Sequence, residues 1–96
     1  MTRELRISRN PEVVARDLRD EEGTLLLHRP TGSYHRLNRT GALIWRVLET
    51  PTSLEELESC IRSELREPPD TLRHDLASYV EDLAGRGLVL LGDLLQ

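Results

Sequence analysis

The chain of 96 residues contains no lysine and no phenylalanine, and it has a single cysteine, Cys60. Without lysine, Schiff-base catalysis and a phosphate-binding loop of the Walker type are excluded. One cysteine has no internal disulfide partner, which is typical of a reducing compartment. Cys60 lies near the apolar stripe of a predicted helix, so we expect a small buried thiol and not a nucleophile.

Long hydrophobic runs are also absent. No apolar segment approaches the roughly 20 residues of a membrane span. The charged N-terminus lacks the apolar stretch found in signal peptides. We therefore expect a soluble, cytoplasmic protein. The net charge of −4 argues against a nucleic-acid partner, since binding to phosphate groups usually requires a basic excess.

Aromatic residues make up only 3% of the chain, so leucine, which occurs nineteen times, must build most of the core. The length suggests one domain with a modest core. We expect a loose N-terminal lead-in over residues 1–11, a packed domain over residues 12–91 and a C-terminal tail over residues 92–96.

The N-terminal half of the chain predicts a small antiparallel meander. Apolar side chains mark three strands, at residues 13–19, 24–29 and 34–37, and turn-forming residues separate them. In such a meander the middle strand is paired on both sides. The third strand keeps one free edge, unless a short last strand predicted at residues 88–91 covers it.

Three predicted helices follow, at residues 39–49, 53–66 and 71–84. The first is apolar nearly all round, so Ile44 and Trp45 are expected in the core. Strands followed by helices indicate an α+β fold. The arrangement is winged helix-turn-helix-like, with a three-stranded antiparallel sheet followed by three helices.

Each predicted helix has a candidate N-cap. Asn38 offers its side-chain oxygen to the free amides of the first helix. Thr52 and Ser53 both offer N-caps for the second helix, and residues 52–55, Thr-Ser-Leu-Glu, have the form of a capping box. Asp70 is placed to cap the third helix.

Residues that carry catalysis or bind metals do not form a recognisable site. The three histidines, His28, His35 and His74, lack the spacing of a metal site, and a lone cysteine adds little to them. Neither a serine–histidine arrangement nor a glycine-rich phosphate loop is present. We therefore predict a binding protein that is not an enzyme and has no metal or cofactor.

The free edge of the third strand suggests how such a protein binds its partner. Unpaired backbone groups accept an incoming peptide as another strand, and pockets beside the edge supply specificity. The third helix is placed to wall such a groove, with Asp75 and Tyr79 on its flank. Its apolar stripe consists of Leu72, Leu76 and Leu83, for which core packing is the alternative role.

The third strand and the helix after it, YHRLNRTGALIW at residues 34–45, resemble the PqqD-like family of precursor-peptide recognition elements. In that family a Leu-Asn pair commonly ends the third strand and leads into a Thr-Gly-Ala turn and an Ile-Trp helix. Here these residues are Leu37, Asn38, Thr40, Gly41, Ala42, Ile44 and Trp45. The next helix opens with Ser-Leu-Glu-Glu-Leu at residues 53–57, also typical of the family, and the similarity covers roughly residues 12–91.

The resemblance implies that the leader segment of a ribosomally made precursor peptide binds as an added strand against the third strand, beside the third helix. Strand side chains alternate, so Tyr34 and Arg36 are expected on one face. His35 and Leu37 then share the other face, with Leu37 pointing inward. Together, the edge and the resemblance give these peptide-binding residues: Ser33, Tyr34, His35, Arg36, Leu37, Leu72, Asp75, Leu76, Tyr79, Val80 and Leu83.

The chain is similar to the discrete leader-binding proteins of lasso-peptide clusters. That similarity implies two further partners, a separate leader peptidase and a macrolactam-forming cyclase. By holding the leader, the protein raises the effective concentration of the precursor at these enzymes. One alternative is a PqqD-type partner of the radical enzyme in quinone-cofactor biosynthesis. Another is a small winged-helix DNA-binding regulator, although the acids of the third helix outnumber its bases.

Overall fold

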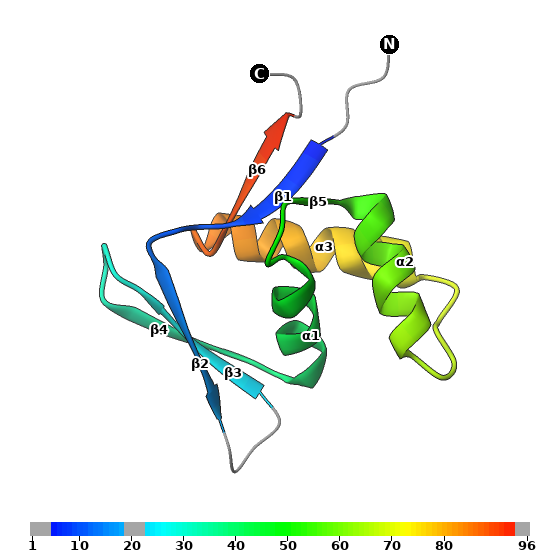
Figure 1. Cartoon of the computed structure of the whole chain (residues 1–96), viewed down its shortest axis with the longest axis horizontal. Helices are drawn as coiled ribbons and strands as arrows, with labels where there is room; N and C mark the ends of the chain where they lie inside the picture. Colours follow the sequence, from blue (N-terminus) through cyan, green and yellow to red (C-terminus); the bar gives the residue numbers. More distant parts are fainter. Residues whose placement is uncertain (1–4, 19–22, 94–96) are drawn as a thin grey trace.

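The protein is described by a computed structural model that covers residues 5–18 and 23–93. Arg19 and most of the first predicted turn lie outside the described residues. Within them, strands and helices form an α+β fold, as the sequence predicts (Figure 1). The winged helix-turn-helix comparison describes this fold only loosely.

The predicted meander is present as an antiparallel sheet of strand order β2-β3-β4. It consists of β2 (Val13–Leu18), β3 (Gly23–His28) and β4 (Ser33–Leu37). β3 lies in the middle, and its pairing with β4 runs from Thr24 opposite Leu37 to His28 opposite Ser33. Each strand lies within about one residue of its predicted position.

A second sheet, of strand order β5-β1-β6, was not predicted. It consists of β1 (Leu5–Arg9), the two-residue β5 (Thr52–Ser53) and β6 (Val89–Asp93). Residues 5–9 are therefore a paired strand and not part of a loose lead-in. The local sequence does not predict this strand, because only Ile7 of its side chains is buried. Its pairing partner, β6, comes from the other end of the chain.

Strand β6 confirms that a last strand follows the helices, but it pairs with β1 and does not cover β4. It also reaches Asp93, two residues into the segment predicted as a C-terminal tail. The packed part of the protein is consequently wider than residues 12–91, since Ile7 belongs to the same core as the helices.

The three predicted helices are α1 (Arg39–Val47), α2 (Leu54–Glu64) and α3 (Leu72–Gly85). None of the helices in the described ranges has the length and apolar character needed to cross a membrane. α1 and α2 each end two residues before their predicted limits, ahead of the next proline.

The cap of α3 differs from prediction, and the capping box of α2 is shifted by one residue. Asn38 caps α1 as expected, because its Oδ1 accepts a hydrogen bond of 2.8 Å from the Gly41 N–H. The capping box of α2 begins one residue later than predicted, at Ser53, and pairs it with Glu56. Asp70 is not the cap of α3, since the N-cap position is Thr71, whose side chain makes no capping hydrogen bond.

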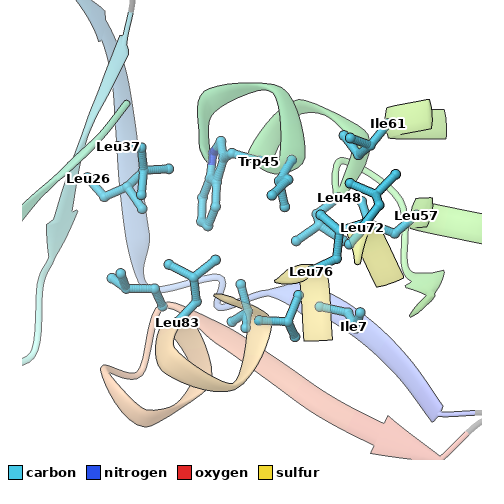
Figure 2. Close-up of a cluster of buried hydrophobic side chains, with 14 residues drawn as sticks. Ile7, Leu26, Leu37, Trp45, Leu48, Leu57, Ile61, Leu72, Leu76 and Leu83 are labelled. Atoms are coloured by element: carbon cyan, nitrogen blue, oxygen red, sulfur yellow. The ribbon is translucent and has the colours of Figure 1, made fainter. Parts of the chain in front are cut away.

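The core lies where the helices meet the inner faces of the two sheets (Figure 2). Its buried side chains are Ile7, Leu26, Leu37, Ile44, Trp45, Leu48, Leu57, Ile61, Leu72, Leu76, Val80, Leu83, Leu88 and Val89. Cys60 is exposed, contrary to prediction, because the stripe of α2 that turns inward passes through its neighbours Leu57 and Ile61.

Arg9, which is partly buried, connects β1 to α1 beside the core residue Trp45. Its guanidinium lies 4.9 Å from the centre of the Trp45 ring, and its Nε and Nη2 donate hydrogen bonds of 2.9 and 2.6 Å to the Trp45 carbonyl oxygen. A cation over an aromatic ring and a carbonyl paired with a guanidinium are both favourable. The N-terminal strand is thus fixed by side chains as well as by its strand pairing.

Arg6 makes a second connection, between β1 and the start of α2. It donates a hydrogen bond of 2.8 Å to Glu56 Oε1, which also accepts from the Ser53 N–H and hydroxyl. These Ser53 hydrogen bonds, with a smaller contribution from Arg6, hold the pKa of Glu56 below its ordinary value of 4.5.

We expect Trp45→Ala to lower the free energy of unfolding by about 3–5 kcal/mol, because it removes a large side chain from a closed core. Urea denaturation followed by circular dichroism measures this loss. Arg46→Ala, an exposed neighbour on the same helix, is the control and should change stability by less than about 0.5 kcal/mol. A Trp45→Ala protein as stable as the control would show that the indole is not part of the core.

We expect the stabilising effect of Glu56 to depend on pH. Because its pKa is lowered by folding, the contribution is fully present above the unfolded value of 4.5 and is lost as the pH falls through the folded pKa. Wild type should therefore be more stable than Glu56→Gln near neutral pH, and the difference should shrink in acid. Denaturation curves for both proteins between about pH 7 and pH 3 test this, and a constant difference would contradict it.

Candidate peptide-binding edge

Strand β4 has one open edge. It pairs with β3 on one side, and no strand within residues 5–18 or 23–93 pairs with it on the other. A strand with an open edge presents a row of backbone N–H and C=O groups, which a further strand can pair with. The edge predicted from the meander is therefore present.

Side chains along β4 alternate between the two faces of the sheet. Tyr34 is 66% exposed and Leu37 only 4%, while His35 is partly buried and Arg36 exposed. The predicted alternation of the β4 side chains between the two faces of the sheet is confirmed, with Leu37 pointing into the core. A strand added beside β4 would alternate in the same way, with every second side chain toward the inner face of the sheet.

The end of β4 is held firmly where it joins α1. The Asn38 cap fixes the first turn of the helix directly after the strand. On the neighbouring strand, a Cβ added to Gly23 would lie 2.6 Å from the Leu37 carbonyl oxygen, so no side chain fits there. The last residues of β4 are thus positioned by a capped helix on one side and a close backbone contact on the other.

Tyr79 of α3 lies against this same junction. A Cβ added to Gly41 would collide with the Tyr79 hydroxyl and would lie 3.1 Å from Leu37 Cβ. Tyr79 is half-buried, and this burial raises the pKa of its hydroxyl, with a further contribution from the negative charge of Asp82. The Tyr79 hydroxyl therefore lies close to Gly41, beside the end of β4, and keeps its proton at neutral pH.

The residues after α3 approach the sheet near the other end of β4. Gly87 has a φ of +75°, and a Cβ placed on it would lie 3.0 Å from Nε2 of His28, which is paired with Ser33. The six helical steps from Tyr79 to Gly85 span about 9 Å, and the four steps from Ser33 to Leu37 span about 13 Å. The two contacts place Tyr79 near the C-terminal end of β4 and Gly87 near the β3 residue that pairs with the first residue of β4.

The other predicted residues of α3 fall into two groups. Leu72, Leu76, Val80 and Leu83 are buried in the core, which confirms the alternative role considered for the apolar stripe. Contact between these side chains and a peptide stays a prediction. Asp75 is exposed one turn before Tyr79, at the end of β4 away from Ser33, and accepts a hydrogen bond of 3.0 Å from Thr71.

The contact between Gly41 and Tyr79 was not predicted. A glycine in the first turn of a helix costs about 1 kcal/mol relative to alanine, so its presence signals that another group comes close. The sequence shows the glycine at position 41, but it does not show that the neighbouring group is Tyr79 of α3. In the described ranges, no group of three or more histidine, cysteine or acidic side chains is arranged to hold a metal ion.

Comparison with known proteins agrees with this arrangement. The family described as "Coenzyme PQQ synthesis protein D (PqqD)" matches residues 23–89, from the start of β3 to the start of β6. Among solved structures, the chain is similar to "TbiB1 in Complex with the TbiA(beta) Leader Peptide", with 29% identity and a TM-score of 0.75. The match covers 85% of this chain and 93% of that chain. No curated protein matches. From the extent of the family match, this chain belongs to the PqqD family.

Proposed function

We propose that this protein binds the leader segment of a ribosomally made precursor peptide and carries out no chemistry on it. The observation that carries the proposal is the open edge of β4, in a chain whose fold matches a structure solved with a leader peptide. An extended leader pairs with residues 33–37 as a further strand, and backbone hydrogen bonds supply much of the affinity.

Helix α3 gives this edge its selectivity. Because α3 runs beside β4, the inward side chains of an added strand lie near Tyr79 and the junction of Leu37 with α1. Its outward side chains lie beside Tyr34 and Arg36, which are exposed. The site therefore favours a leader with an apolar side chain at the inner positions, where water is excluded.

The narrower proposal concerns the pathway. We infer that the bound precursor is delivered to a separate leader peptidase and a macrolactam-forming cyclase, as in lasso-peptide biosynthesis. Binding raises the effective concentration of the precursor at an enzyme without any catalytic group in this chain. The similarity to TbiB1, a structure solved with a leader peptide, supports the leader-binding step of this pathway.

The family description favours a second pathway, in which the protein serves the radical enzyme of quinone-cofactor biosynthesis. Both pathways use the same leader-binding site. The neighbouring genes distinguish them: a peptidase and an asparagine-synthetase-like cyclase indicate a lasso peptide, whereas a radical enzyme indicates the quinone cofactor.

Fluorescence polarisation tests the proposed function directly. The probes are a labelled leader segment from a precursor gene beside the gene for this protein and the labelled TbiA(beta) leader peptide. We expect saturable binding of the first probe and weaker binding of the second. A labelled DNA duplex serves as the competing ligand, and saturable binding to DNA with none to either leader would overturn the proposal.

Within this assay we expect Tyr79→Ala to weaken leader binding about tenfold, since a half-buried aromatic anchor commonly contributes more than 1 kcal/mol. Tyr79→Phe keeps the ring and should bind nearly as wild type. Ser78→Ala, at an exposed position on the same helix, is the matched control. Unchanged affinity in a folded Tyr79→Ala protein would remove Tyr79 from the site.

A further inference from the structure

Trp45 carries a buried hydrogen-bond donor that has no partner in the described part of the chain. Its side chain is 5% exposed, and its indole N–H is covered by other atoms but donates to none of them. The other large side chains of the core are leucine, isoleucine and valine, which bring no donor with them. A buried donor without an acceptor costs free energy, so its presence favours an acceptor supplied by another molecule.

The groups next to the indole do not accept hydrogen bonds. Arg9 lies 4.9 Å from the centre of the ring, and a guanidinium is a donor only. Figure 2 shows the nitrogen of Trp45 on the edge of the ring that faces Leu37 and Leu26, whose side chains have no polar atom. The N–H is therefore directed toward the sheet that contains β4 and away from α2.

This direction leads to the C-terminal end of the open edge. Gly41 precedes Trp45 by about one turn of α1, so both lie on the same face of the helix. The space above Gly41 is filled by the Tyr79 hydroxyl and bordered by Leu37. Gly41, Leu37 and Trp45 are buried, whereas Tyr79 is half-buried. Tyr79 is thus the neighbour that can move aside when a ligand enters beside the end of β4.

We propose that the Trp45 N–H donates a hydrogen bond to a side-chain oxygen of the bound leader, from the leader residue that lies opposite Leu37. This inference rests on the proposed function. Residues opposite each other in paired strands point to the same face, with Cβ atoms about 4.5–5.5 Å apart. Leu37 points into the core, so the leader side chain opposite it enters between Leu37 and Tyr79 and reaches the indole.

The acceptor is an amide or hydroxyl oxygen and carries no charge. The place it enters is lined by apolar atoms, where an ionised carboxylate would lose its hydration. Asparagine, glutamine, serine, threonine and tyrosine provide such an oxygen. This leader position therefore differs from the other inner positions of the added strand, which favour apolar side chains. Trp45 makes the site specific for one polar residue at a fixed place in the leader.

Nuclear magnetic resonance observes this hydrogen bond directly, because Trp45 is the only tryptophan of the chain and gives its only indole N–H signal. The isotopically labelled protein is titrated with the leader segment encoded by the neighbouring precursor gene. We expect the indole proton signal to move downfield and its exchange with deuterium to slow. A scrambled peptide of the same composition is the control and should leave the signal in place.

The outcomes of this titration separate the inference from the proposed function. A leader that binds saturably and leaves the indole signal and its exchange unchanged would overturn the inference alone. A wild-type protein that binds no leader would overturn the proposed function and this inference with it. Alanine replacement along the leader identifies the acceptor, since one replacement should abolish the indole shift while binding continues. If every replacement that still binds keeps the shift, the acceptor is not a leader side chain and the inference is wrong.

Replacing Trp45 by 3-benzothienylalanine removes the N–H and keeps the two-ring shape. We expect the dissociation constant for the leader to rise about tenfold, the usual effect of one lost hydrogen bond. The midpoint of urea denaturation of the free protein should not fall, because the N–H has no acceptor there. A purely structural N–H predicts the reverse, a lower midpoint and an unchanged affinity, and that result would overturn the inference.

A double-mutant cycle tests whether the two groups meet. The Trp45 analogue combined with the alanine variant of the acceptor residue should lose about tenfold in affinity, no more than either change alone. Additive losses of about 100-fold would show that the two groups act separately and would overturn the inference. If circular dichroism shows that the analogue does not fold, the alanine variants of the leader decide the question through the indole signal of wild type.

Discussion

The burial of Trp45 is the constraint on which the rest of the structure depends. Its indole points from α1 into the core between Leu37 of the first sheet and Leu83 of α3 (Figure 2). Arg9 covers the ring and binds the Trp45 carbonyl oxygen, so β1 of the second sheet is attached at the same place. One side chain therefore sets how α1, β4 and α3 lie relative to one another. A peptide-binding edge needs this, since affinity falls when strand and helix are not held in place.

In the proposed function, the protein binds its partner mainly through backbone groups at a strand edge. With 96 residues and few aromatics it has a modest core and little material for a deep pocket. An open strand edge can form many hydrogen bonds with a partner through backbone groups, and it therefore requires few specific side chains. In the described part of the chain each sheet has two edge strands, β2 and β4 in one and β5 and β6 in the other. Of these, β4 is the one whose end lies close to Tyr79 of α3, at the junction of Leu37 with α1.

Local signals in the sequence predicted most of the fold, and long-range contacts account for what they missed. The meander, the Asn38 cap and the three helices follow from apolar spacing and turn residues within short windows. Strand β1 was missed because its partner β6 lies at the other end of the chain and its own sequence is polar. Cys60 was misplaced because neighbouring positions on a helix point in different directions. The open edge of β4 was predicted from topology, but the contact of Tyr79 with Gly41 depends on tertiary packing and was not.

The central claim is that a leader peptide adds to β4 as a strand. A scan of the labelled leader by backbone N-methylation tests it most directly, because each methyl group removes one hydrogen-bond donor and leaves the side chains unchanged. In a paired strand, alternate N–H groups point toward the partner. The account predicts that affinity falls at least about tenfold at every second position and little at those between. Losses with a helical period, or no periodic loss at all, would contradict it.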